Sequence, residues 1–330
     1  MKNVLVTGGA GYIGSHLCKA LFKNGYVPVV YDNLVYGHKE AVKWGNFVHG
    51  DINDITKLTD VIKDYKPLGV IHFAAFAYVG ESVINPGKYY SNNVSGTINL
   101  LEAMRVSGLD KIVFSSTCAV YGEPEKIPIT ENETKKPINP YGKTKSMIEE
   151  ILSDYFKAYK TKSICLRYFN ASGADSECEI GENHDPETHL IPIVLDNVIG
   201  KRDVITVFGN DYDTIDGTCI RDYIHVEDLA DAHVKALNLM LESENLENDV
   251  FNLGTGTGYS IMEIIDTVEK ITGKKVNYKI GDRRPGDPPK LIANAEKAFN
   301  RLKWKPKNSS LDNIIKTAWE WHKNLYVKER

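Results

Sequence analysis

Short hydrophobic runs alternate with longer amphipathic segments through the first half of the chain. The hydrophobic runs predict strands at residues 4–6, 27–31, 45–50, 69–73, 111–115 and 163–169. The segments between them carry apolar residues at helical spacing and predict helices at 16–24, 55–65, 86–107 and 140–160. Strands and helices that alternate in this way are typical of a doubly wound α/β fold with a parallel sheet.

The rhythm changes after Asn170, where residues 171–190 are polar and predict a loop. Beyond it the pattern predicts a helix at 191–200, a strand at 205–208 and a helix at 226–241. Residues 260–330 predict two amphipathic helices joined by a basic, proline-containing loop at 282–290. We therefore predict a first domain at 1–170, to which the chain returns around 203–250, and a smaller C-terminal α/β domain mainly within 171–330.

Composition narrows the possible partners of this 330-residue chain. The net charge of -4 and the absence of a long Lys/Arg run argue against nucleic acid and against an anionic membrane. The five cysteines are scattered without zinc-site spacing, which predicts reduced thiols, a cytoplasmic protein and no metal site. The apolar run Val4-Leu5-Val6 is too short for a signal peptide, and no segment has the length needed to span a bilayer.

A glycine-rich turn follows the first predicted strand. Gly8, Gly11 and Gly14 have the spacing at which a dinucleotide pyrophosphate meets the start of a helix, as in Rossmann-type domains. Asp32 ends the second strand, where a carboxylate would bind both ribose hydroxyls and repel a 2′-phosphate. We predict NAD rather than NADP; the alternative is a turn without ligand and an Asp that caps a loop.

Tyr141 and Lys145 lie on one face of a helix that the Asn139-Pro140 pair begins. A neighbouring ammonium and the positive end of the helix dipole both favour the phenolate, which predicts a tyrosine that accepts a proton near neutral pH. Together with a dinucleotide, such a base indicates hydride chemistry at an alcohol carbon.

Ser115-Ser116-Thr117 ends the strand begun at Lys111, at the sheet edge where α/β proteins bind ligands. A hydroxyl there can hold the substrate oxygen and relay a proton. Alone, such a run is more often backbone capping, and a Y-x-x-x-K match is common by chance. Their joint occurrence after a dinucleotide turn favours the catalytic interpretation.

At this point the chain resembles the extended short-chain dehydrogenase/reductase family, and within it the nucleotide-sugar 4-epimerases. The resemblance covers nearly the whole chain and rests on V-T-G-G-A-G-Y-I-G-S-H, F-S-S-T-C-A-V-Y-G, N-P-Y-G-K-T-K, L-R-Y-F-N-A-S-G-A, the segment from Phe208 to Val226, and R-R-P-G-D. It implies a seven-stranded dinucleotide domain, a small nucleotide-sugar domain, and a homodimer formed through the helices at 86–107 and 140–160.

The resemblance also assigns residues. It implies that NAD contacts Gly8, Gly11, Tyr12, Ile13, Gly14, Asp32, Asn33, Asp51, Ile52, Phe73, Ala74, Ala75, Asn93, Ser115, Tyr141, Lys145 and Phe169. It implies that a UDP-sugar contacts Thr117, Tyr141, Asn170, His189, Leu190, Val207, Phe208, Arg221, Arg284 and Asp287. Tyr141, Lys145 and Thr117 would be catalytic. A guanidinium fork suits a diphosphate, although Arg284 is also compatible with a solvated loop charge.

Four positions depart from the family pattern. Ala77 stands where many relatives have a lysine that contacts the cofactor, and Thr117 replaces a serine. His189 replaces a frequent asparagine and can donate to phosphate, although a packed or solvated histidine is equally compatible. Leu291 replaces a tyrosine found at the sugar pocket of some relatives, and a smaller side chain there is expected to admit 2-acetamido sugars.

The expected reaction interconverts UDP-glucose and UDP-galactose by oxidation at C4 with NAD, rotation of the 4-keto sugar and reduction on the other face. Related dehydratases need an acid and a carboxylate after the hydroxyl residue, whereas Cys118 and Ala119 follow Thr117 here. Alternatives are epimerisation of another UDP-sugar (an N-acetylhexosamine, pentose or uronate) and a non-catalytic NAD-binding module.

Overall fold

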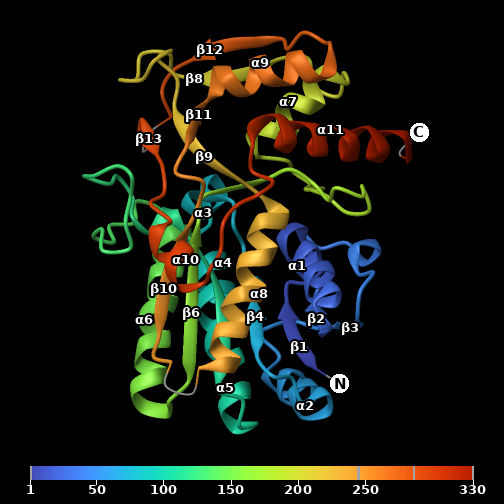
Figure 1. Ribbon diagram of the computed structural model, residues 1–330, viewed down its shortest axis with the longest axis vertical. Helices are drawn as coiled ribbons and strands as arrows, with labels where there is room; N and C mark the ends of the chain where they lie inside the picture. Colours follow the sequence, from blue (N-terminus) through green and yellow to red (C-terminus); the bar gives the residue numbers. More distant parts are fainter. Residues whose placement is uncertain (1, 244–245, 285–286, 329–330) are drawn as a thin grey trace.

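The computed structural model describes residues 2–243, 246–284 and 287–328. Its centre is a parallel sheet of seven strands in the order β10-β6-β5-β4-β1-β2-β3 (Figure 1). The strands are β1 (Asn3–Thr7), β2 (Val27–Asp32), β3 (Asn46–His49), β4 (Val70–His72), β5 (Lys111–Thr117), β6 (Lys162–Tyr168) and β10 (Asp249–Leu253). The predicted doubly wound α/β fold is confirmed.

Helices cover both faces of this sheet. One face packs against α1 (Tyr12–Lys23) and α8 (Val226–Glu242), and the other against α2 (Ile55–Tyr65), α5 (Gly96–Val106) and α6 (Pro140–Tyr159). Alternate residues of β1 serve the two faces: Val4 and Val6 are buried with α1 and α8, and Leu5 is buried with α2 and α5. This burial on both sides explains why the strands read as continuous hydrophobic runs in the sequence.

The helix ends follow local chemistry. The Asn139 side chain accepts a hydrogen bond from Gly142 N at 2.8 Å, and Pro140 occupies the first turn of α6. Asp54 caps α2 in the same way, through Lys57 N at 3.0 Å. These caps explain why the predicted bounds of both helices agree with the structure.

The helix predicted at 86–107 is not one regular helix. It consists of α4 (Pro86–Tyr89), a π-helical segment (Tyr90–Ser95) and α5. Asn93, in the π-helical segment, is buried, and its amide exchanges hydrogen bonds of 2.9 and 3.0 Å with the backbone of Phe76. A widened turn of this kind is common at functional sites, and here it carries an amide that binds the loop after β4.

A second, smaller group of elements lies beyond the carboxyl ends of the main strands (Figure 1). It contains a four-stranded sheet of β7 (Asn170–Ser172), β9 (Ile220–His225), β11 (Gly258–Ser260) and β13 (Lys290–Leu291), and a two-stranded sheet of β8 (Ile205–Phe208) and β12 (Tyr278–Gly281). Its helices are α7 (Leu190–Val198), α9 (Ile261–Thr272) and α11 (Leu311–Lys328), which share one hydrophobic core.

The prediction of two helices in residues 260–330 is wrong, because α10 (Glu296–Arg301) lies between α9 and α11. Strands β7, β9, β10, β11, β12 and β13 were not predicted from the sequence. Most are too short to show a period, and β10 is identified by its position beside β6. The remaining short elements are α3 (Val79–Ile84) and the 3-10 turns Lys39–Ala41 and Cys118–Val120. Among the described residues no helix is long and apolar enough to cross a membrane.

Candidate active site

The glycine-rich turn joins β1 to α1 in a conformation that requires glycine at two positions. Gly8 has a φ of +75°, and a Cβ there would lie 2.6 Å from Ala74 N. A Cβ on Gly14 would lie 2.2 Å from Gly8 O. At Gly11 the nearest such atom is Gly8 O, at 3.4 Å, so packing does not demand glycine there. The open space beside Gly11, at the start of α1, is where a pyrophosphate could approach the backbone.

Asp32 lies next to this turn at the end of β2. It is buried, and its two carboxylate oxygens accept hydrogen bonds from Ala10 N at 3.0 Å and Leu34 N at 2.8 Å. Burial raises the pKa of the carboxyl group, and the two backbone donors oppose that rise. Asn33 donates to Asp51 at 2.8 Å, so the polar residues predicted around the adenosine are close together.

The loop after β4 is held over the same edge. Phe73 N and Ala74 N both donate to Thr7 O, at 2.9 and 3.1 Å, and Ala75 follows them. Asn93, which binds the backbone of Phe76, also donates to Thr144 on α6 at 3.2 Å. The amide of Asn93 is thus used to position the loop and to connect it to the helix that carries Tyr141.

The lysine expected at position 77 from the family pattern is absent, but another ammonium lies close by. Lys88, on α4, has its Nζ 4.1 Å from the ring centre of Phe76 and 3.1 Å from the hydroxyl of Tyr36. This arrangement could not be predicted from the sequence, because α4 and the loop after β4 meet through tertiary contacts.

Four other predicted cofactor residues are partly or fully buried. The Tyr12 hydroxyl donates to Gly173 O at 2.6 Å, which joins the first turn of α1 to the loop after β7. Ile13 packs against the core on the α1 face, and Ile52 is buried in the core on the opposite face. Phe169, the fourth in this set, is buried in a separate cluster with Val120 and Tyr121.

Tyr141, Lys145, Ser115 and Thr117 meet at the carboxyl end of β5. Lys145 Nζ donates to the main-chain oxygen of Ser115 at 2.8 Å and lies 6.0 Å from the centre of the Tyr141 ring. The Ser115 hydroxyl shares a hydrogen bond of 2.6 Å with the hydroxyl of Tyr168. Thr117 Oγ1 accepts from Ala119 N at 3.1 Å and interacts with Tyr141.

The electrostatics of Tyr141 differ from the prediction. Burial, followed by the charge of Tyr168, raises the pKa of the phenol well above its usual value, and the interaction with Thr117 opposes this rise. Lys145 does not offset the burial, because its ammonium is directed at the Ser115 carbonyl. A phenol with this pKa is protonated at neutral pH.

The pKa of Lys145 is shifted in the opposite direction. Burial lowers the pKa of its ammonium to about 7, while the charge of Glu149 one turn further along α6 acts to raise it.

Sequence reasoning missed a buried network directly beneath this edge. Glu149 binds Arg167 through two hydrogen bonds, of 2.8 and 2.6 Å, and accepts a third from the Ser116 hydroxyl at 2.7 Å. Arg167 also donates to the Tyr121 hydroxyl at 2.9 Å. The four-residue spacing of Lys145 and Glu149 was the available signal, since it places both on one helix face.

The residues expected to hold a diphosphate are together on the other side. Arg221 Nη2 donates to Asp287 Oδ1 at 2.9 Å, and Arg284 Nε donates to Asp287 Oδ2 at 2.9 Å. The Arg284 guanidinium lies 5.6 Å from the ring centre of Phe208. Arg221 is mostly buried, whereas 63% of the Arg284 side chain is exposed. The charge of Arg221 also acts on the buried thiol of Cys118, which places it near Thr117.

The remaining predicted substrate residues are distributed around this group. Asn170 pairs with Tyr223 at the start of β7, and Leu190 begins α7. The Val207 side chain is buried in the core of the smaller group, so Val207 can offer a ligand its backbone alone. His189 is bound to Glu182 through Nδ1, and is thus a paired histidine in this structure.

Leu291 lies where a sugar pocket was expected. It pairs with Arg221 across β13 and β9 and packs against the cluster that contains Cys118 and Phe169. Leu291 is therefore next to Arg221 in the sheet and packs against the same hydrophobic cluster as Cys118, the residue after Thr117.

The comparisons with known proteins agree with this arrangement. Residues 4–254 match the NAD dependent epimerase/dehydratase family. The UDP-glucose 4-epimerase of Rhizobium meliloti (strain 1021) is 52% identical over 321 residues, which are 97% of each chain. The chain belongs to the NAD dependent epimerase/dehydratase family, and the expectation of an epimerase of the short-chain dehydrogenase/reductase type is confirmed.

Solved structures extend the similarity to the fold. The crystal structure of UDP-glucose 4-epimerase from Brucella ovis in complex with NAD has a TM-score of 0.95 and 53% identity, covering 98% of this chain and 99% of that one. UDP-glucose-4-epimerase from Stenotrophomonas maltophila with bound NAD and formylated UDP-arabinopyranose has a TM-score of 0.96 and 37% identity, covering 99% and 100%.

Proposed function

We propose that this enzyme interconverts UDP-glucose and UDP-galactose by oxidation and re-reduction at C4 of the sugar. The observation that carries the proposal is the meeting of Tyr141, Lys145 and Thr117 at the carboxyl end of β5. The relatives named above, one of them solved with NAD and one with NAD and a UDP-sugar, support the same reaction.

The residues present fit an NAD molecule. Gly8 and Gly14 allow the close turn, the space beside Gly11 would take the pyrophosphate, and the buried carboxylate of Asp32 would bind the adenosine ribose. When bound, NAD supplies the group that takes up and returns a hydride. We propose that the other cofactor residues are those named from the sequence, with Asn93 acting through the Phe76 loop.

The chain's own residues would supply binding and proton transfer. We assign the acid/base role to Tyr141, with Lys145 setting its charge and Thr117 holding the sugar hydroxyl. Arg221 and Arg284 would bind the diphosphate, because two guanidinium groups already converge on one anionic side chain, Asp287. A substrate anchored through its nucleotide leaves the hexose free to turn between the two hydride transfers.

The test is incubation of the purified full-length protein with UDP-galactose and no added cofactor, followed by chromatographic separation of the sugars. We expect UDP-glucose to accumulate to an equilibrium mixture, and NAD to be released when the protein is denatured. An unchanged substrate pool, with NAD present in the protein, would support the alternative of a non-catalytic NAD-binding module.

A second candidate substrate follows from Leu291. Leu291, like Cys118, packs against the cluster that contains Phe169, so its side chain would set the room available next to the sugar. Epimerisation of UDP-N-acetylglucosamine would support this extension, and the Leu291→Tyr variant should then lose that activity while keeping the activity toward UDP-galactose. The wild-type protein's failure to convert UDP-N-acetylglucosamine would exclude it. The described part of the chain contains no feature that favours a pentose or uronate substrate.

Three further expectations complete the proposal. Exposed Ile98 and Met147, on α5 and α6, support a homodimer formed through these helices. The position of α8 and β10 against the main sheet supports a chain that returns to the first domain after entering the second. The scattered free cysteines support a cytoplasmic location.

A further inference from the structure

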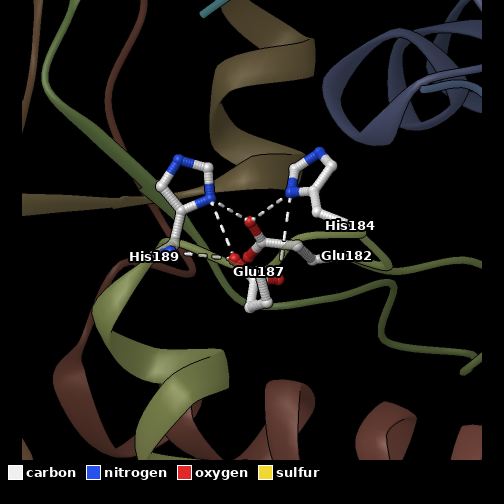
Figure 2. Close-up of side chains that lie close together, drawn as sticks. All are labelled: Glu182, His184, Glu187 and His189. Carbon is white, nitrogen blue, oxygen red and sulfur yellow. Dashed lines mark hydrogen bonds and ion pairs between the residues drawn. The ribbon is translucent and has the colours of Figure 1, made fainter. Parts of the chain in front are cut away.

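Four side chains with metal-binding chemistry converge outside the proposed catalytic edge. Glu182, His184, Glu187 and His189, here called the loop cluster, each direct one ligand atom toward the others, and these atoms all lie within 4.8 Å of one another (Figure 2). His184 Nδ1 lies 3.1 Å from a Glu182 oxygen and 3.9 Å from a Glu187 oxygen, and His189 Nδ1 lies 3.6 Å from Glu187.

The loop cluster comes from one short segment between β7 and α7. Two imidazoles and two carboxylates within eight residues can reach one point only if the loop folds back on itself, which it does here. Three of the four side chains are largely buried, and His189, next to α7, is about half exposed. Such a set resembles a closed site more than a solvated surface group.

His184 is not satisfied by the protein. Its Nδ1 is buried and has no hydrogen-bond partner in the described part of the chain, although a Glu182 oxygen lies 3.1 Å away. The two groups are close, but their relative orientation does not meet hydrogen-bond geometry. A nitrogen lone pair and a carboxylate that lie close together without a hydrogen bond, both directed at a common point, have the geometry of two ligands that share one metal ion.

The ion pairs of the loop cluster also indicate a binding site for a cation. Across the described residues, neither Glu182 nor Glu187 has an ion pair with Lys or Arg; their partners are the two histidines. The nearby acidic group of Asp175, Glu177 and Glu179 differs, because the Lys19 ammonium lies between its members at 2.8, 2.5 and 2.6 Å. The acidic group is filled by a lysine ammonium, whereas the partners within the loop cluster are imidazoles, which can exchange a proton for a metal ion.

We propose that the loop cluster binds one divalent first-row transition-metal ion, of which Zn²⁺ is the best match. Imidazole and carboxylate ligands suit this class of metal. Zinc bonds of about 2.0–2.1 Å in a tetrahedron place neighbouring ligand atoms about 3.4 Å apart. The ligand atoms of the loop cluster already lie within 4.8 Å of one another; around an ion the contact between His189 and Glu182 would lengthen and the wider separations would close.

The ion would fix the loop that leads into α7. The rings of Tyr12 and Tyr78 meet His184 edge-on, with centres 6.3 and 6.1 Å away, so the site borders the first turn of α1. The metal would therefore connect the glycine-rich turn with the segment that carries Leu190. This proposal does not depend on the proposed function, and it departs from the expectation of no metal site, which considered cysteine spacing alone.

The test uses full-length protein treated with a chelator, dialysed and titrated with ZnCl₂ in a calorimeter. We expect one equivalent of Zn²⁺ to bind, and Glu187→Gln or His189→Ala to weaken the affinity by at least about 100-fold, since changes even in the outer shell of such sites cost 10- to 100-fold. His184→Ala should do the same. Cobalt in place of zinc should give the intense visible absorption of a tetrahedral site in the wild type.

Two variants are matched controls. His38→Ala removes a histidine that binds the same loop through Asn183 O at 2.8 Å, and Glu177→Gln removes an exposed carboxylate of the acidic group with Lys19. Both should bind Zn²⁺ as the wild type does. If His184→Ala does not fold, judged by circular dichroism, the half-exposed position of His189 still decides the question. Absence of stoichiometric binding, or equal loss in the controls, would overturn the proposal.

Discussion

Two groups of residues hold their polar side chains in different ways. The catalytic edge of the main sheet consists of Ser115, Thr117, Tyr141 and Lys145, and the arginine group of the smaller part consists of Arg221, Arg284 and Asp287. At the edge, Lys145 and Ser115 are buried, and Lys145 is bound to the main chain. In the arginine group, Arg284 is largely exposed, and it is held with Arg221 by the single carboxylate of Asp287. The edge is fixed by the fold itself, whereas the arginine group is fixed by its own ion pairs.

The difference indicates how each region responds to a ligand. Buried groups at the edge are positioned before anything binds, so they can act on a reacting atom without further ordering. When a diphosphate binds, the two arginines must share or exchange their contacts with Asp287. They are therefore expected to determine the affinity for the substrate. Changes at the edge should therefore alter turnover or stability, and changes in the arginine group should alter substrate binding.

The largest effect is expected from Tyr141→Phe. Loss of a positioned acid/base group lowers turnover by roughly two to four powers of ten, while NAD content should be unchanged because the ring is kept. The measurement is the initial rate with UDP-galactose together with the NAD released on denaturation. Tyr159→Phe changes an exposed tyrosine of the same helix and should be neutral. Normal turnover in Tyr141→Phe would remove this residue from the reaction.

Glu149→Gln should cause the next largest effect, on stability. The change leaves the buried Arg167 without its carboxylate, and breaking a buried ion pair costs about 3–5 kcal/mol, with the lower value expected since Gln keeps an acceptor. Urea unfolding of both proteins measures the difference. Glu150→Gln alters the exposed neighbour and should have little effect. Equal stability of Glu149→Gln and the wild type would show that the ion pair of Glu149 with Arg167 does not stabilise the catalytic edge.

Arg221→Lys should sharpen the comparison through substrate binding. Lysine cannot reproduce the fork that joins Asp287 to the carbonyl of Pro288. Loss of a charged hydrogen bond of about 1.5–3 kcal/mol should raise KM for UDP-galactose about 10- to 100-fold with a smaller change in kcat. Arg283→Lys, in the same basic segment but paired with Asp211, is the control. A large fall in kcat with constant KM would assign Arg221 to the edge instead.

The smallest effect is a pH dependence of stability due to Lys145. Because burial lowers the pKa of Lys145 to about 7, the unfolded chain binds a proton above that pH that the folded chain lacks. The free energy of unfolding should therefore rise with pH above 7, by up to about 1.4 kcal/mol per unit.

His189 contributes in the opposite direction. The carboxylate of Glu182 outweighs the effect of burial and raises the pKa of His189 to about 9, so its contribution is lost as the pH rises toward 9. The free energy of unfolding of the Lys145→Met variant is measured at each pH from 7 to 9 and subtracted from that of the wild type. The subtraction removes the contribution of His189, which both proteins share. The stability of the wild type should increase relative to that of the variant as the pH rises. Parallel curves of unfolding free energy against pH would contradict the lowered pKa of Lys145.

Much of the main sheet could be predicted because its signals are local. The runs at β1, β2 and β4, the glycine-rich turn and the Asn139-Pro140 helix start each lie within a few residues. The fold class and the family followed from them. The π-helical segment could not be predicted, because it depends on Asn93 reaching the backbone of Phe76 in a different part of the chain.

The candidate site was predicted as a set of residues but not as an electrostatic environment. Spacing placed Lys145 near Tyr141, but the pKa of the phenol depends on burial among β5, β6 and α6, which the sequence does not show. Likewise, the loop cluster needs a folded-back segment to bring Glu182 to His189. Residue types are encoded locally, whereas burial and partner choice come from contacts far apart in sequence.

The acceptor of the Lys145 ammonium is a peptide carbonyl and not a side chain. A main-chain oxygen is present whatever residue occupies position 115, so single substitutions there cannot delete it. A substitution at Ser115 would therefore remove the hydroxyl contact with Tyr168 while the amine stays anchored. For protein engineering, position 115 therefore separates two interactions of one residue, because its hydroxyl can be exchanged and its carbonyl cannot.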